Sequence, residues 1–288
     1  MDGQVSCCQA VRHTLLLATA ALAVAMADAG QSGVHGQARL DARYSVTLNG
    51  LPIGRGSWVI DIGDDHYSAA ASGATAGIMR IFASGQGQSA VRGTVSAGQL
   101  VPTNYMASVS TDKKYDEVHM VMSAGTVKEF SAEPPYSPDV SRVPVTDAHR
   151  HGVSDPMTAP LVRVPGSGDT VVPQACQRNL SIFDGRMRYD VHLAFKRIEQ
   201  VRTQIGYQGP AVVCAAYFAP IAGYVPDRYA IKYIAEQRDM EIWLAPIAGT
   251  RILAPYRVSV PTPIGVGVMQ ASQFVTVPQP SKATAKTQ

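Results

Sequence analysis

A run of alternating charged side chains between residues 184 and 192 is the part of this sequence best suited to chemistry. In the stretch SIFDGRMRYD, Asp184 and Asp190 flank Arg186 and Arg188, and His192 continues the row. Residues two apart on a strand point to the same side, about 7 Å apart, so the two guanidinium groups could grip one anionic group. Alternatively, the carboxylates and the imidazole could supply the acid–base groups of a hydrolase or transferase.

The same stretch also has a structural interpretation, which we favour. Asp184-Gly185 lies between two apolar runs, and this dipeptide is the strongest short signal for a β-hairpin. After it, apolar residues from Met187 to Phe195 alternate with charged ones, as in a strand whose wet face pairs its charges with a neighbouring strand. We therefore predict a hairpin at Asp184-Gly185 with the arginines on its solvent face, and the anion site stays open as the alternative.

Other chemical motifs in the sequence are weak. His149 and His151 form a His-x-His pair, which binds zinc or copper only when further ligands converge, and a polar loop explains them as well. The sequence contains no Gly-x-Ser-x-Gly elbow, no His-Glu-x-x-His and no phosphate-cradling glycine loop. We therefore expect no metal and no cofactor, and a non-enzymatic protein is favoured over an enzyme.

Most of the chain alternates apolar and polar residues with the period of a β-strand. Residues 38–48 alternate in this way, Asn49-Gly50 supplies a turn, and residues 51–62 return as a second strand. Further strands are expected at residues 66–71, 78–83, 88–95, 100–110, 115–122, 126–131, 187–195, 201–207, 211–218, 227–235, 240–247, 251–260 and 264–277. This regular spacing predicts an all-β fold, namely a single large, strongly curved antiparallel sheet that forms an open barrel or β-spiral over residues 38–277.

Residues 133–173 interrupt this pattern with a proline-rich connection. Prolines are incompatible with central strands, so the segment should cross from one half of the sheet to the other. Asp155-Pro156 fits the start of a short helix through Met157 to Leu161, and a second helical turn is expected around Cys176. The connection is either an inter-domain linker or a lid, and the shared β pattern on both sides favours the lid.

The first 29 residues are typical of a signal peptide. Leu15 to Met26 is an apolar run too short to span a bilayer, and Ala27-Asp28-Ala29 is a small-x-small cleavage pattern. We expect export to the periplasm and a mature chain from Gly30, with residues 30–37 flexible and residues 278–288 disordered. A buried helix or an uncleaved anchor is the alternative for the apolar run.

Cleavage would also set the cysteine count and the charge. Cys7 and Cys8 leave with the leader, so Cys176 and Cys214 remain as an even number in an oxidising compartment, which predicts a disulfide. A reactive thiol or metal pair is the rival interpretation, but the sequence has no Cys-x-x-Cys. The sequence has 25 basic and 22 acidic residues, and the leader contains one of the basic and two of the acidic ones. The expected mature chain therefore keeps 24 basic and 20 acidic residues. This small, dispersed excess excludes a nucleic-acid footprint, and no later stretch is apolar enough to make an integral membrane protein.

Several short motifs occur in one order along the chain. They are YSVTLNGLPIG at Tyr44–Gly54, SDPMT at Ser154–Thr158, FDGRMRYD at Phe183–Asp190 between Cys176 and Cys214, Gly223-Tyr224, and PYRV at Pro255–Val258. Together they resemble the exported bacterial proteins grouped as domain-of-unknown-function family 3108, over nearly all of the expected mature chain. The resemblance implies a periplasmic β-rich open barrel or spiral, and a bridging cysteine pair at Cys176 and Cys214. A more distant resemblance is to periplasmic envelope-integrity proteins with a β-spiral architecture. Neither resemblance implies a reaction.

We carry three functional hypotheses from the sequence. The first is a non-enzymatic binding or scaffold protein of the cell envelope, which holds a lipid, another apolar ligand or a partner segment in a concave sheet lined by aromatics such as Tyr217 and Tyr224. The second is an envelope hydrolase or transferase that uses the strand face from Asp184 to His192. The third is a support for an assembly with a periplasmic protein through an exposed strand edge.

Overall fold

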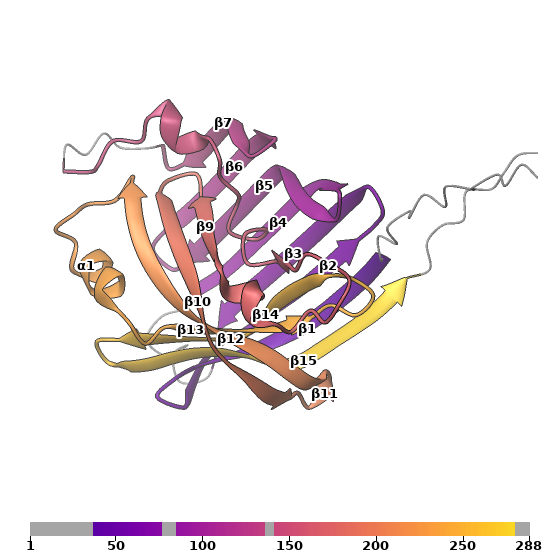
Figure 1. Cartoon of the computed structure of the whole chain (residues 1–288). Coiled ribbons are helices and arrows are strands. Elements are labelled where there is room, and N and C mark those ends of the chain that lie inside the picture. Colours follow the sequence, from indigo (N-terminus) through magenta and orange to yellow (C-terminus); the bar gives the residue numbers. More distant parts are fainter. Residues whose placement is uncertain (1–36, 77–84, 136–140, 280–288) are drawn as a thin grey trace, which may run out of the picture. The chain divides into compact units, whose positions relative to one another are not determined.

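The structure, a computed structural model, describes residues 37–76, 85–135 and 141–279. In these residues the chain forms one fifteen-stranded sheet, one α-helix and two short 3₁₀ helices (Figure 1). The strands before the connection are β1 (Gln37–Leu48), β2 (Leu51–Ile62), β3 (His66–Thr75), β4 (Gly85–Ser96), β5 (Gln99–Thr111), β6 (Tyr115–Ser123) and β7 (Thr126–Glu133). They are followed by η2 (Asp147–Arg150), β8 (Val162–Arg163), η3 (Pro173–Cys176), β9 (Arg178–Phe183), β10 (Arg188–Arg202), β11 (Ile205–Gly206), β12 (Gln208–Ala222), α1 (Tyr229–Glu236), β13 (Glu241–Pro246), β14 (Ile252–Thr262) and β15 (Gly265–Gln279).

The strands follow one another as a single ribbon. The order across the sheet is β7-β6-β5-β4-β3-β2-β1-β15-β14-β13-β12-β10-β9, and β8 and β11 add short pairings to β14 and β15. All neighbours on this path are antiparallel, while the two-residue pairing of β11 with β15 is parallel. The predicted all-β fold with one large, unclosed antiparallel sheet is confirmed.

Local sequence explains the first hairpin. In β1, Leu40 and Ala42 are fully buried while Arg39 on the opposite face is exposed, as alternation requires. Asn49 and Gly50 both have positive φ, at 48° and 80°, which is the backbone of a two-residue hairpin turn. β1 and β2 then pair along their whole length, as predicted.

The proline-rich connection joins the two edges of the ribbon. On one side, the backbone N–H of Val153 donates to the carbonyl of Gly125, next to β7. On the other side, the N–H of Ser154 donates to Ser181 in β9, and its carbonyl accepts from Phe183. The unpaired edges β7 and β9 are therefore linked through residues 153 and 154 of the connection.

Two hydrophobic clusters bury the two faces of β12. Ala211 and Val213 belong to the larger cluster, whereas Val212 and Cys214 belong to a smaller one with residues of β8 and η3. In the smaller cluster, Cys176 and Cys214 form the predicted disulfide, with 5.4 Å between their Cα atoms.

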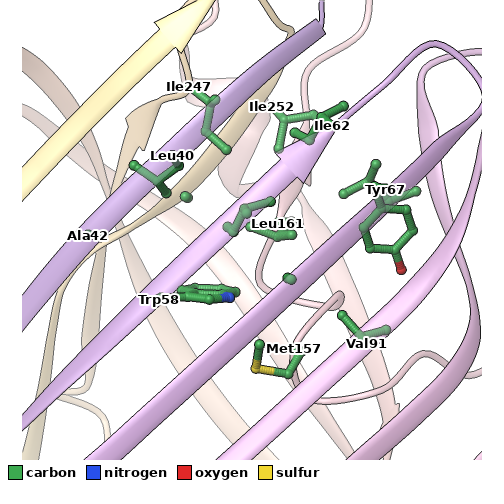
Figure 2. Close-up of a cluster of buried hydrophobic side chains, with 14 of the residues drawn as sticks. Leu40, Ala42, Trp58, Ile62, Tyr67, Val91, Met157, Leu161, Ile247 and Ile252 are labelled. Carbon is green, nitrogen blue, oxygen red and sulfur yellow. The ribbon is translucent and has the colours of Figure 1, made fainter.

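The larger cluster covers what we call the inner face of β1–β7, the face that bears Leu40, Trp58, Tyr67 and similar buried side chains. Met157 and Leu161 of the connection pack into this cluster, among the side chains of β1–β4 (Figure 2). Side chains of the chain itself therefore cover this part of the inner face.

Several local expectations were wrong. Residues 227–235, expected as a strand, contain helix α1. Tyr229 and Tyr233 are four residues apart, a spacing that fits both periods, and their ring centroids lie 5.9 Å apart, one helical turn from each other. The strand expected at 187–195 is β10, which continues to Arg202 past a bulge between Phe195 and Arg197. Of the strand expected at 201–207, only residues 201–202 belong to β10, and residues 205–206 form the short strand β11.

Other boundaries moved less. The turn after Asp155 stays a single turn, in which Ala159 N–H donates to the Asp155 carbonyl, and Pro160 has no N–H with which to continue a helix. The strand expected at residues 78–83 and the leader at 1–29 lie outside the described residues, while β15 extends to Gln279, into the expected tail. No described helix is both long and apolar enough to cross a membrane.

Candidate functional site

The predicted hairpin joins β9 to β10, and Asp184 is its main structural residue. The N–H of Asp184 donates to the carbonyl of Met187 at 3.1 Å. Its Oδ1 accepts from the N–H groups of Arg186 at 2.8 Å and Met187 at 2.7 Å. Burial raises the pKa of Asp184, and these hydrogen bonds oppose that rise. Asp184 therefore closes the turn, with its Oδ1 directed to its own backbone.

The two arginines do not share one anion. Arg186 lies in the turn, where Nε donates to Oδ1 of Asp116 in β6 at 3.2 Å and Nη2 donates to the carbonyl of Pro134 at 3.1 Å. Arg188 forms an ion pair with Asp190, whose second oxygen accepts from Asn179 at 2.8 Å. Although burial favours the protonated acid, the hydrogen bonds from Asn179 and Arg188 hold the pKa of Asp190 below its ordinary value.

His192 lies opposite Asn179, the residue that donates to Asp190, in the pairing of β10 with β9. His192 stacks on Tyr217 of the neighbouring strand β12, with ring centroids 6.3 Å apart. The guanidinium group of Arg238 also lies over the Tyr217 ring, 6.0 Å from its centroid. Tyr224 follows β12, and its carbonyl accepts from Val143 of the connection. The strand face thus consists of separate cross-strand contacts, each with its own partner.

The two histidines of the connection have local partners. Nδ1 of His149 accepts from the backbone N–H of Thr146 at 3.1 Å, at the start of η2. Nδ1 of His151 lies 3.3 Å from the hydroxyl of Thr126 in β7. Within the described ranges, no three His, Cys, Asp or Glu side chains come together as a group that could hold a metal ion.

A buried polar cluster surrounds Asp155, a residue that the sequence indicated only as the start of a turn. Asp155 is fully buried, and its Oδ1 accepts from the N–H groups of Met157 at 2.8 Å and Thr158 at 3.0 Å. The Thr158 hydroxyl lies 2.6 Å from the hydroxyl of Tyr67 in β3. Oδ2 of Asp155 and Oγ of Ser154 are buried, and neither has a hydrogen-bond partner among the described residues.

The charge of Asp155 acts on three tyrosines, two on the inner face and one on β10. Burial raises the pKa of Tyr67, Tyr105 and Tyr189, and the negative charge of Asp155 raises it further in each case. Burial also raises the pKa of Asp155 itself, against the hydrogen bonds from Thr158 and Met157. Because Asp155 follows the two residues that link β7 to β9, this cluster fixes the connection inside the sheet.

We predict that Asp155→Asn raises the melting temperature at pH 7 and that the gain disappears toward pH 4. Burial places the folded-state pKa of Asp155 above its unfolded value, so the folded state binds more protons between the two values and its stability falls as pH rises through that window. Asparagine keeps the Oδ1 acceptor and removes the charge. The check is thermal unfolding of both proteins from pH 4 to pH 8.

The control for this prediction is Asp155→Ala, which removes the acceptor as well. It should be about 2 kcal/mol less stable than Asp155→Asn, because two buried N–H groups lose their partner. Parallel melting curves for wild type and Asp155→Asn across this pH range would contradict the assignment.

A surface groove crosses β4–β7 on the outer face, the face opposite the larger cluster. Its volume is about 690 Å³, within the range of ligand sites. Strand register places its outward side chains in two adjacent rows, Ala90-Met106-His119-Ser131 and Arg92-Asn104-Val121-Glu129. Met106 and Val121 are 40% and 42% exposed at the centre, on neighbouring strands, while Arg92 and Glu129 stand at opposite ends of their row.

This groove was not predicted from the sequence. The only local signal was an apolar residue at an outward position of each central strand, Met106 next to inward Tyr105 and Val121 between inward Met120 and Met122. Which residues stand beside them depends on the pairing of four strands, which a local pattern does not give.

Comparison with known proteins gives a family. The crystal structure of a β-barrel-like protein of domain of unknown function DUF1849 from Brucella abortus is similar, with 10% identity and a TM-score of 0.46, over 84% of this chain and 98% of that one. No curated protein matches the chain. The model of the family "Protein of unknown function (DUF3108)" matches residues 43–272, which is most of the chain. The chain therefore belongs to the DUF3108 family of proteins of unknown function.

Proposed function

We propose that this protein is a non-enzymatic binding or scaffold protein of the bacterial cell envelope, exported to the periplasm, and that it holds an extended segment of a partner protein in the β4–β7 groove. The observation that carries the proposal is the groove itself, with exposed Met106 and Val121 between two oppositely charged ends. The leader sequence and the disulfide support export.

The groove has the chemistry of a peptide site. Arg92 on β4 and Glu129 on β7 are three strands apart, which is about 14 Å at the usual strand spacing. An extended segment of about four residues spans that distance at about 3.3 Å per residue. A segment with an apolar centre, an acidic group toward Arg92 and a basic group toward Glu129 would complement the groove.

The carboxylates of the strand face give less support to an enzyme. Asp184 is held by its own turn, and Asp190 is held by Arg188 and Asn179. A hydrolase would need one of them free to exchange a proton with a substrate. A binding protein does not require either carboxylate to leave its present hydrogen-bond partners.

The test is site-specific cross-linking of periplasmic extract with a photoreactive side chain at Ser131, on the rim of the groove. Wild type should capture a defined partner, and Met106→Glu and Val121→Glu should each lower its capture about 10-fold or more, since burying either apolar side chain is worth at least about 1.5 kcal/mol. Arg92→Glu should weaken capture in a salt-dependent manner.

The matched control is Ile198→Glu on β10, where the side chain is 48% exposed and lies outside the groove lining. This variant should capture the partner as wild type does. Equal loss in all variants, or no loss in either groove variant at unchanged melting temperature, would overturn the proposal.

A further inference from the structure

Two neighbouring turns form an exposed apolar tip at one end of the sheet. The tip consists of Leu51 and Pro52 after the β1–β2 turn, and of Ile264 and Val266 at the β14–β15 turn. Leu51 is 62%, Ile264 72% and Val266 43% exposed. These side chains lie together because β1 pairs with β15 up to Leu48 opposite Gly267. So much apolar surface at the ends of two hairpins indicates an interaction surface.

Asn49 joins the two turns into one rigid unit. Its backbone N–H donates to the carbonyl of Val266 at 3.0 Å, and its Nδ2 donates to the carbonyl of Ile264 at 2.9 Å. Its Oδ1 accepts from the N–H of Val266 at 2.9 Å. The apolar tip is thus held in one arrangement before any partner arrives, which lowers the entropic cost of binding.

The charges around the apolar tip are asymmetric. Residues 44–54 and 258–268 contain no charged side chain, and the charged residues that border them are Arg43, Arg55 and Arg257. The carboxylate of Glu241, opposite Ser259 in the sheet, is held by Lys196 and Arg197. At the other end of the same hairpin the β2–β3 turn carries acidic side chains instead, Asp61, Asp64 and Asp65.

Arg43 and Arg55 line a second groove, further along β1 and β2 from the apolar tip. This groove, of about 470 Å³, lies over β1–β4 and is also bordered by Ser57, Gln86 and Gln88. Register places Arg43 opposite Ser57 and Arg55 opposite Ser45, so the two arginines are diagonal neighbours on the outer face. Two guanidinium groups at that spacing can bind one phosphate between them.

We propose that this end of the protein docks on the surface of an anionic phospholipid bilayer. Arg55 is four residues from Leu51, about 13 Å along the strand, so side chains inserted about 5–10 Å into the interface leave the arginine at the level of the phosphates. The apolar tip supplies insertion, and Arg43 and Arg55 supply attraction to negative headgroups. This surface shares no residue with the lining of the β4–β7 groove, so the inference does not depend on the proposed peptide site.

The experiment is co-sedimentation of the purified protein with vesicles of phosphatidylcholine alone or with 30% phosphatidylglycerol. Wild type should bind the anionic vesicles at least 10-fold more tightly than the neutral ones. The double variant L51D/I264D should lose binding to both by at least 10-fold, whereas R43E/R55E should lose only the preference for anionic vesicles. Ile198→Asp, an exposed apolar position away from the tip, should bind as wild type.

Three results would contradict membrane docking, and one further variant separates it from the peptide groove. Absence of vesicle binding by wild type, or unchanged binding by L51D/I264D at an unchanged melting temperature, would overturn the proposal. So would a change from dimer to monomer in L51D/I264D without an effect on vesicles, which would make the tip a contact between two copies. Val121→Glu should keep full vesicle binding, so failure of the peptide groove and failure of membrane docking are separately visible.

Discussion

Replacing Cys176 and Cys214 together by alanine is expected to lower the free energy of unfolding by about 4 kcal/mol. The bridge closes a loop of 38 residues, and the loss of chain entropy in the unfolded state corresponds to about that value for such a loop. The loop contains β9 and β10 with their hairpin turn, so the bridge holds η3 to β12 around this hairpin. Urea denaturation of oxidised wild type and the double variant measures the difference.

Reduction provides the control. Dithiothreitol should bring wild type close to the stability of the double variant and leave the double variant unchanged. Both cysteines are fully buried among Val162, Val212 and Leu244, so the alanines fit without a new polar group. A loss below about 1 kcal/mol would mean that packing of η3 against β10 and β12, and not the bridge, holds this region together.

The sequence predicted the strands well where one face of the ribbon is dry and the other wet. Over residues 38–44 of β1 and 58–62 of β2, every second side chain enters the larger cluster, so alternation and the Asn49-Gly50 turn define both strands. The hairpin at Asp184-Gly185 was predicted for the same reason, and Gly185 has φ of +89°. These are local properties that a single chain segment contains.

The prediction failed where pairing with another strand extends an element and where two periods coincide. β10 continues through residues 196–200 because β12 pairs with it on the far side of the bulge, which the charged residues there do not indicate. Helix α1 has aromatic and branched residues at spacings that suit a strand as well. In both places the structure is decided by packing against other elements.

The candidate site shows the same limit more strongly. Charges close in sequence drew attention to residues 184–192, yet Arg186 finds its carboxylate 70 residues away, on Asp116 of β6. The environment of Asp155 depends on Tyr67, which lies in a strand before the connection. The β4–β7 groove exists only once four strands are in register. The contact of Arg186, the environment of Asp155 and the groove all depend on long-range strand pairing, which a local sequence pattern does not give.

Gly185→Ala is expected to lower the free energy of unfolding by about 3 kcal/mol. This loss is larger than the loss expected for alanine at a turn glycine whose added Cβ would meet no other atom. A Cβ at Gly185 would lie 2.2 Å from Cγ1 of Val118, a buried residue of β6, and φ is +89°. The unfavourable backbone conformation contributes about 1 kcal/mol, and overpacking against β6 contributes about 1–3 kcal/mol more. Denaturant unfolding of the purified variant measures the loss.

Gly152→Ala separates the two contributions, because Gly152 also has positive φ, at +64°, but a Cβ there meets nothing within 4 Å. It should lose only about 1 kcal/mol. In the background of Gly185→Ala, Val118→Ala removes the clashing methyl group and should cost less than it does in wild type, with a coupling energy of about 1–2 kcal/mol in the double-mutant cycle. Additive effects, or equal losses for both glycines, would mean that the hairpin tip does not press on β6. In that case the contact that brings the β9–β10 hairpin across to β6 would rest on polar contacts such as the ion pair of Arg186 with Asp116.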